Sequence, residues 1–407
     1  MDQVETLRIE SGAWQTENTN WEGILKNDGP PLGQIIFTSA RTIENAPQVL
    51  RAGIFKRFKI APFLFNRVYL ESNGFSGCES MHDENRSLIS YNHWSRFIVK
   101  QTHTELRPKS SFTRHYSFGE ISPLSKSNAP IHGPGSVKHG WEWYEMGFFV
   151  HWTPPCSTTL LCFDLPEHMK ASFQSALQSV TEKSDLIDPY AVFGTVIHEI
   201  LSLYNDSVWS LRNHICSMEA VRPQEPNYPY LHEIARHAIH VSETLSVALE
   251  SINALQMQHQ DYAVQYSQDS NRWNKIYNQF QFQRRVLHGL LLRSESNKAR
   301  IQNEITLAFN TAAQRDSSIQ VRIGEEAKKE TSAMKAIAVV TMTFLPATFV
   351  ASIFSTSFFH FEPSVRGSKE TFVVSDKFWM YWVLAAPLSV AALGLWMFWD
   401  RMLGKKH

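Results

Sequence analysis

The chain has 407 residues, carries 39 lysines and arginines against 39 aspartates and glutamates, and has a formal net charge of zero at pH 7. This length allows about two to three domains, and the balanced charge, with no basic stripe interleaved with aromatic residues, excludes an electrostatic case for a nucleic-acid partner. The four cysteines form no C-x-x-C pair and no zinc-type Cys/His spacing, so we expect reduced thiols and no structural metal site.

The first part of the chain, residues 1–187, is predicted to be a cytosolic α/β domain. Residues 1–31 are polar and acidic, which excludes a secretory signal segment there. Three short aromatic and β-branched runs predict strands: residues 96–102, 148–152 and 158–163. A turn is expected at the Pro-Pro pair of residues 154–155, between the last two runs. Residues 107–140 are rich in Ser, Pro, Gly and Lys, which is the composition of an exposed or disordered insertion.

Residues 188–335 are predicted to form cytosolic helical hairpins followed by a long stalk helix. No proline occurs between Pro229 and Pro346, and a segment without helix breakers favours long helices. Asp188, as a cap, and the proline that follows it, as a first-turn residue, predict the start of the first helix. A second helix is expected to begin near Tyr230, where apolar residues recur at spacings of three and four.

An apolar stripe follows one side of the predicted stalk helix. Its members, at spacings of three, four or seven, are Ile301, Ile305, Ala308, Ala312, Ile319, Ile323, Ala327 and Met334. A narrow stripe on a long helix favours a seam between copies of the chain, because an exposed helix of this kind would not be stable alone. The alternative is a helix that packs on its own domain.

No motif in the sequence points to catalysis. Phosphate-binding G-x-x-x-x-G-K, dinucleotide-binding G-x-G-x-x-G and nucleophile-elbow G-x-S-x-G patterns do not occur in a strand-to-helix context. His232 and His237 are five residues apart, so on a helix they point roughly 140° away from each other and cannot share a zinc ion. His237 and His240 could share one, but we expect both on a solvated helix face. We therefore predict no enzyme and no cofactor.

Two segments near the C-terminus, residues 336–359 and 378–399, predict transmembrane helices. The first has about 24 residues without a charge, enough at ~1.5 Å per residue to cross a hydrocarbon core of roughly 30 Å. The second has aromatic residues at both ends, as membrane interfaces favour. Lysines and arginines lie before the first span and after the second, which predicts cytosolic termini, an extracytosolic loop at residues 360–377 and a cytosolic tail at residues 400–407. The lipid bilayer, of the plasma membrane or another endomembrane, is the expected partner, and two buried core helices are the alternative.

One face of the first predicted span becomes rich in hydroxyl groups toward its outer end. At the spacing of the stalk stripe this face carries Met334, Ala338, Thr341, Leu345, Thr348, Ser352 and Ser355. The opposite side, which suits lipid or the second helix, carries Val340, Phe344, Phe349, Ile353 and Phe354. The hydroxyl face could line an axial pore if several copies pack around it. Alternatively, its small residues could simply allow close helix packing.

A resemblance to a known family lies in residues 334–359, which have the sequence MKAIAVVTMTFLPATFVASIFSTSFF. This segment resembles the first transmembrane helix of the CorA family of divalent-cation channels, with its Leu-Pro-x-Thr-Phe core at residues 345–349. Three further segments resemble CorA-like proteins of filamentous fungi: ARIQNEITLAFNTAAQRDSS, DPYAVFGTVIHEI and LHEIARHAIHVSETL. The resemblance implies a CorA-like fold, with an α+β cytosolic domain, a long helical stalk and two transmembrane helices, assembled as a funnel-shaped homopentamer.

The outer mouth of the pore is where the chain departs from that family. Alignment through the Leu-Pro-x-Thr-Phe core places Ser355, Thr356 and Ser357 where the family has Gly-Met-Asn, or Gly-x-Asn in the zinc-transporting ZntB branch. The resemblance implies passive flow of a divalent cation, Mg²⁺ or Zn²⁺-like. The expected pore-lining residues are Met334, Thr341, Leu345, Thr348 and Ser352. The competing hypothesis is a non-conducting, membrane-anchored scaffold or sensor that keeps the CorA-like architecture.

Overall fold

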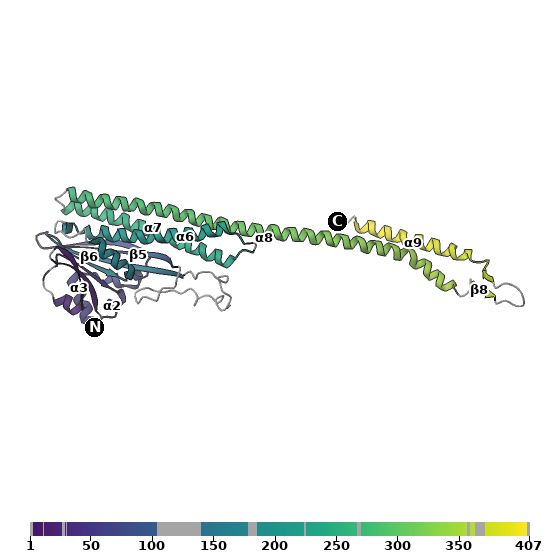
Figure 1. Ribbon diagram of the computed structural model, residues 1–407, viewed down its shortest axis with the longest axis horizontal. Coiled ribbons are helices and arrows are strands. Elements are labelled where there is room, and N and C mark those ends of the chain that lie inside the picture. The colour runs from purple at the N-terminus through teal and green to yellow at the C-terminus, as the bar shows by residue number, and fades with distance from the viewer. Residues whose placement is uncertain are drawn as a thin grey trace. The chain divides into compact units, whose positions relative to one another are not determined.

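Figure 1 shows the computed structural model of the protein. The described residues are 3–10, 12–26, 29, 31–103, 140–177, 185–223, 225–266, 270–355, 359–362 and 371–404. The chain divides into two compact units, Met1–Ala308 and Phe309–His407. The insertion expected at residues 107–140 lies outside the described residues, apart from Gly140, which begins a strand.

A seven-stranded sheet forms the centre of the first unit, in the order β2-β1-β3-β7-β6-β5-β4. The strands are β1 (Val4–Glu10), β2 (Ala13–Thr19), β3 (Gly33–Thr38), β4 (Gly74–His82), β5 (Leu88–His103), β6 (Gly140–Thr153) and β7 (Ser157–Phe163). Neighbouring strands are antiparallel, except that β3 and β7 are parallel. The three predicted strands are confirmed within β5, β6 and β7, and the expected turn at residues 154–155 joins β6 to β7.

Helices cover both faces of this sheet, which explains why its central strand β7 is apolar at successive positions instead of alternating. The shorter helical segments are α1 (Trp21–Lys26), α2 (Ala40–Glu44), α3 (Gln48–Phe58), η1 (Pro62–Phe65), α4 (Arg67–Leu70), α5 (Glu167–Leu177) and η3 (Asp185–Ile187). On one face, Ile36 and Leu161 of the sheet belong to a core that includes residues of α1, α2 and α3. On the other face, Ile35 and Leu160 belong to the larger core formed with the long helices.

The long helices are α6 (Ala191–Ala220), α7 (Tyr228–Tyr266) and α8 (Ser270–Phe354), so the predicted hairpins and long helix are confirmed. The expected start at Asp188 is wrong, because α6 begins at Ala191. One carboxylate oxygen of Asp188 accepts a hydrogen bond from the Tyr190 N–H at 2.8 Å, and the other lies 2.9 Å from Nε2 of His259 on α7. Asp188 therefore ties α7 to the turn before α6 instead of capping the first helical turn.

The apolar stripe of α8 has two different environments. Ile301 and Ile305 are only 1% and 4% exposed, and both belong to the core of the first unit. For this part of the stripe, packing of the helix on its own domain is correct and the expected seam between copies is wrong. Farther along the helix, Ile319 and Ile323 are 40% and 58% exposed, so their apolar side chains still lack cover within one chain.

A buried group of titratable residues lies between β5, β6 and α7. Lys100 Nζ is 2.9 Å from Nδ1 of His240 and lies 4.5 Å from the ring centroid of Trp143. His237 is 1% exposed and stacks on Trp141 with 3.5 Å between the ring centroids, so the expected solvated position is wrong for His237. Burial lowers the pKa of Lys100 to about 7 and the pKa values of His237 and His240 to about 4.

The second unit contains the last part of α8, a two-stranded hairpin and the helix α9 (Trp379–Gly404). The hairpin pairs β8 (Phe359–Glu362) with β9 (Thr371–Val374), and its first pair is Phe359 with Val374. The first apolar helix therefore ends at Phe354, not at the predicted boundary of residue 359, because Phe359 already belongs to a strand. The second apolar helix starts at Trp379, as expected to within one residue, and continues to Gly404.

Candidate functional site

Two helices in the described part of the chain, α8 and α9, are long and apolar enough to cross a membrane by length and composition. Only 11% of the most apolar window of α8 and 6% of that of α9 are buried within the chain. A core helix of a soluble domain is mostly buried, so this exposure disfavours the alternative of two core helices. The apolar side chains of both helices need another apolar environment, either lipid or further copies of the chain.

Helix α9 packs on one definite side of α8. On α8, Pro346 and Val350 are buried, and the carbonyl oxygen of Ala347 accepts a hydrogen bond from the Tyr381 hydroxyl of α9 at 3.3 Å. Ala385 of α9 is 2% exposed. This contact side also includes Thr343, which is partly buried, so it runs for two turns or more along α8.

The predicted pore-lining residues lie on the other side of α8. The described members are all exposed: Met334, Thr341, Leu345, Thr348, Ser352 and Ser355. At 100° per residue, their mean direction is about 170° around the helix from that of Val339, Thr343, Pro346 and Val350. We call this side the hydroxyl face. Because α9 packs on the far side, the small hydroxyl side chains do not serve close packing with α9. The hydroxyl face can instead contact water or other copies of the chain.

Two of the five side chains that were expected to lie opposite the hydroxyl face, Phe344 and Phe349, lie closer to its flanks. Phe349 is 61% exposed and Phe344 is 62% exposed, and at 100° per residue they flank the hydroxyl face by roughly 60–80° on its two sides. The far side is occupied by the contact with α9. If several copies packed around the hydroxyl face, these two phenylalanines would lie at the contacts between neighbouring copies, and α9 would lie outermost.

The hydroxyl groups of this face bond to their own helix. Thr341 Oγ1 donates to the Ile337 carbonyl at 2.8 Å, Thr348 Oγ1 to the Leu345 carbonyl at 2.9 Å, and Ser352 Oγ to the Phe349 carbonyl at 3.0 Å. A hydroxyl has a single hydrogen to donate, so while these bonds to the helix are made, each of these oxygens acts toward an outside group as an acceptor. The face therefore offers a line of oxygen acceptors to whatever lies in front of it.

The predicted filter is described in part. Ser355 follows the last residue of α8, and its Oγ donates to the Ser352 carbonyl at 3.3 Å, whereas Thr356 and Ser357 lie outside the described residues. The β8–β9 hairpin was missed from the sequence, although FHFE and TFVV are short aromatic and β-branched runs at the two ends of the loop. Among the described residues, no group of three or more His, Cys, Asp or Glu side chains is placed to hold a metal ion.

Comparison with known proteins gives distant similarities. No family model matches the chain. "Notoamide biosynthesis cluster protein M'" of Aspergillus versicolor is 28% identical over 274 residues, and the match spans 61% of this chain and 58% of that relative's length. Two solved structures are similar at TM-scores below 0.5. The full-length CmaX protein has a TM-score of 0.45 and 12% identity, covering 98% of this chain and 97% of that chain. The ZntB cytoplasmic domain of Vibrio parahaemolyticus has a TM-score of 0.44 and 7% identity, covering 77% and 98%.

Proposed function

We propose that the chain is a membrane protein that, in several copies, forms a passive path for a divalent cation, Mg²⁺ or Zn²⁺-like. The observation that carries this proposal is the exposed hydroxyl face of α8, which lies on the side of the helix away from α9. Helices that present acceptor oxygens to a shared axis, with their apolar sides toward a second helix and lipid, are suited to line an aqueous path.

The chemistry of the face favours a hydrated cation over an anion. Water molecules bound to a dication direct their hydrogens outward, so the hydration shell donates hydrogen bonds and needs acceptors around it. Thr341, Thr348 and Ser352 serve as acceptors while their hydrogens are bonded to the helix. Mg²⁺ gives up its waters reluctantly, so a wall that binds the hydration shell without replacing it suits such an ion. The cation would be cargo and not a resident cofactor.

The assembly and orientation belong to the same proposal. The resemblance of residues 334–359 to the CorA family supports a homopentamer, with the stalk part of α8 and both termini in the cytosol. The exposed Ile319 and Ile323 supply apolar surface for contacts between copies along the stalk. The lysines and arginines before the first span and after the second support the same orientation, in the plasma membrane or another endomembrane.

A second candidate function is a non-conducting scaffold or sensor anchored in the membrane. It is favoured by one observation, the absence of Gly-Met-Asn at residues 355–357, where the sequence is Ser-Thr-Ser. Under this alternative the hydroxyl face would serve close packing between copies and no ion would pass.

A pair of matched threonine variants tests the role of the hydroxyl face. Thr348→Val removes a hydroxyl from that face, whereas Thr343→Val makes the same chemical change on the side that contacts α9, where Thr343 Oγ1 donates to the Val339 carbonyl at 2.7 Å. We expect Thr348→Val to lower cation flux into proteoliposomes by about fivefold or more, since each copy loses one acceptor worth about 1 kcal/mol. Thr343→Val should leave the flux nearly unchanged. Equal fluxes for the two variants would contradict the assignment of the face.

A further inference from the structure

A row of polar side chains crosses the sheet of the first unit where an apolar core would be expected. Directly paired positions on neighbouring strands place Arg8 beside Gln34, Gln34 beside Thr159, Thr159 beside His151, and His151 beside Asn92. Residues directly opposite each other across strands share a face of the sheet. The next row on the same face, two residues along each strand, includes Ile36, Leu161 and Phe149 of the second hydrophobic core.

This polar row is not simply the solvated edge of the sheet. Gln34 and Thr159 are each 4% exposed and Asn92 is 1% exposed. Buried polar groups are normally hydrogen-bonded, because leaving one without a partner costs roughly 1–3 kcal/mol. Gln34 Nε2 and Arg8 Nε are nevertheless buried without a hydrogen-bond partner among the described residues. Asn92, by contrast, has a partner on both amide atoms: its Nδ2 donates to the Lys59 carbonyl at 3.1 Å, and its Oδ1 lies 2.8 Å from His151 Nδ1.

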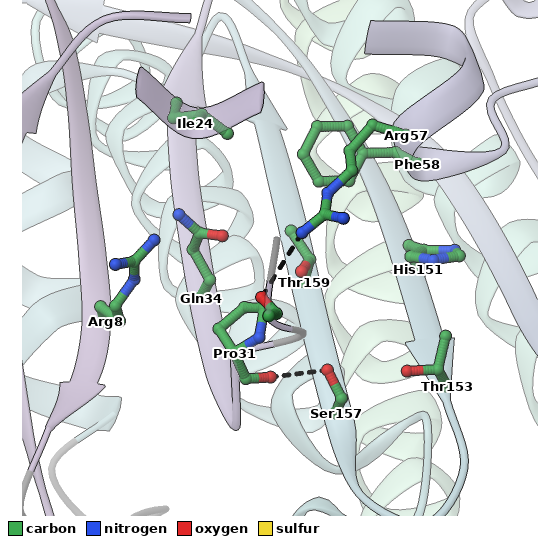
Figure 2. A pocket seen from close by; sticks show the side chains of 11 residues that line it. Arg8, Ile24, Pro31, Gln34, Arg57, Phe58, His151, Thr153, Ser157 and Thr159 are labelled. Atoms are coloured by element: carbon green, nitrogen blue, oxygen red, sulfur yellow. Dashed lines mark hydrogen bonds between the residues drawn. The ribbon is translucent and has the colours of Figure 1, made fainter. Parts of the chain in front are cut away.

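The two residues that carry these unbonded nitrogen atoms, Arg8 and Gln34, line a cavity of about 130 Å³ between the sheet and the short helices. A single water needs roughly 10–15 Å³ measured in this way, so the cavity can hold a polyatomic ion or several waters. Figure 2 shows Arg8 and Gln34 on one side of the cavity and Arg57 of α3 with His151 on the other, with Thr159 between them. The described residues that line it include no aspartate or glutamate.

Among the described residues that line the cavity, the charged groups are the guanidinium groups of Arg8 and Arg57, and Arg57 also donates to the Gly29 carbonyl at 3.4 Å. Arg8 forms an ion pair with Glu17, but the atoms are 3.9 Å apart and the Glu17 side chain is 53% exposed, so this ion pair is weak. Burial, together with the charges of Lys59 and Arg57, lowers the pKa of His151 to about 4. At pH 7 the imidazole is therefore neutral, and the two guanidinium groups supply the charge at the cavity.

We propose that this cavity binds a small tetrahedral oxyanion of the phosphate class, either as a free ion or as the end group of a larger phosphate. The donors approach from three strands and a helix: Arg8 on β1, Gln34 on β3, Thr159 on β7 and Arg57 on α3. Donors spread over several directions suit four tetrahedral oxygens better than the two coplanar oxygens of a carboxylate. Guanidinium groups also match phosphate geometry well. An anion here would give Gln34 Nε2 and Arg8 Nε the partners that they lack.

Calorimetric titration of the full-length protein in detergent with inorganic phosphate tests this site. We expect saturable binding by the wild type, and an affinity about tenfold or more lower for Arg57→Gln. Lys56→Gln is the matched control, because Lys56 is the neighbouring residue on α3, is exposed, and does not line the cavity. It removes the same charge and should change the affinity less than about twofold. Gln34→Leu, which conserves volume and removes only the amide, should also weaken binding.

Melting curves without phosphate identify which variants fold. If Arg57→Gln does not fold, the Gln34→Leu variant still tests the site. Equal weakening by Lys56→Gln and Arg57→Gln, or no binding by the folded wild type, would overturn the proposal. Acetate binding as tightly as phosphate would overturn the assignment to a tetrahedral anion. Titration with glycerol phosphate distinguishes a free phosphate ion from the phosphate end group of a larger molecule. If glycerol phosphate binds as tightly as inorganic phosphate, the ligand is the end group of a larger molecule. If only inorganic phosphate binds, the ligand is the free ion.

Discussion

Replacing Ile323 with aspartate separates assembly of the stalk from folding of the chain. Ile323 is 58% exposed within one chain. Complete burial of an isoleucine side chain contributes about 1.5–3 kcal/mol of free energy. Burial of the exposed part of Ile323 by neighbouring copies therefore stabilises the oligomer by roughly 1–2 kcal/mol per chain, or roughly 5–9 kcal/mol in a pentamer. Aspartate removes this contribution and places like charges at one seam, which costs more. We expect Ile323→Asp to dissociate the oligomer in mild detergent, measured by native mass spectrometry.

Ile305 provides the contrasting control, because it is 4% exposed and already buried in the core of the first unit. Even truncation to alanine at such a site costs about 2–5 kcal/mol of folding stability, so Ile305→Asp should unfold the sheet domain. Hydrogen exchange of the strands reports this directly: Ile305→Asp should accelerate it strongly, and Ile323→Asp should leave it close to wild type. An Ile323→Asp protein that keeps its oligomeric state would refute the idea that copies meet along this part of α8.

Three further predictions concern pH and the pore mouth. The pKa of Lys100 is lowered to about 7, so between pH 7 and 10.5 the unfolded chain binds a proton that the folded chain lacks, and this destabilises the folded chain. Lys100→Met removes this destabilisation. We therefore expect it to raise the free energy of unfolding by about 3 kcal/mol more at pH 7 than at pH 9.5. A pH-independent effect would contradict this. The pKa of His237 is lowered to about 4, so the free energy of unfolding should fall as the pH falls from 6.5 to 4. His237→Phe, which can still stack on Trp141, should reduce that loss of stability. If the variant unfolds in acid at the same pH as the wild type, the protonation of His237 does not cause the loss. Replacing residues 355–357 with Gly-Met-Asn should raise Mg²⁺ flux, since carboxamides offer stronger oriented dipoles than hydroxyls; unchanged or lower flux speaks against a filter there.

Much of the fold follows from local sequence patterns. The β-branched and aromatic runs at residues 96–102, 148–152 and 158–163 became strands, and the proline-free region after Pro229 became long helices. The uncharged length of residues 336–359 and 378–399 predicts the two apolar helices, and the spacing of Ser and Thr along the first predicts its hydroxyl face. These features depend on residues close together in the chain, so their physical cause is visible in a short window.

What could not be predicted depends on partners distant in sequence. The apolar stripe gives the same signal at Ile305 and at Ile323, although one packs in its own domain and the other is exposed, because periodicity does not identify what a face packs against. The burial of His237 requires Trp141 of a distant strand. The polar row between Arg8 and His151 exists only through strand register, which joins residues more than a hundred positions apart.

Passage of a divalent cation through copies of this chain can be measured as flux into proteoliposomes. Purified protein is reconstituted into vesicles that contain a metal-sensitive dye, and Mg²⁺, Zn²⁺, Co²⁺ and Ni²⁺ are added outside in turn. Protein-free vesicles give the background. We expect influx of at least one of these ions above background, driven by its gradient alone. Background influx of all four ions through an intact oligomer would contradict transport and leave the membrane-anchored scaffold or sensor.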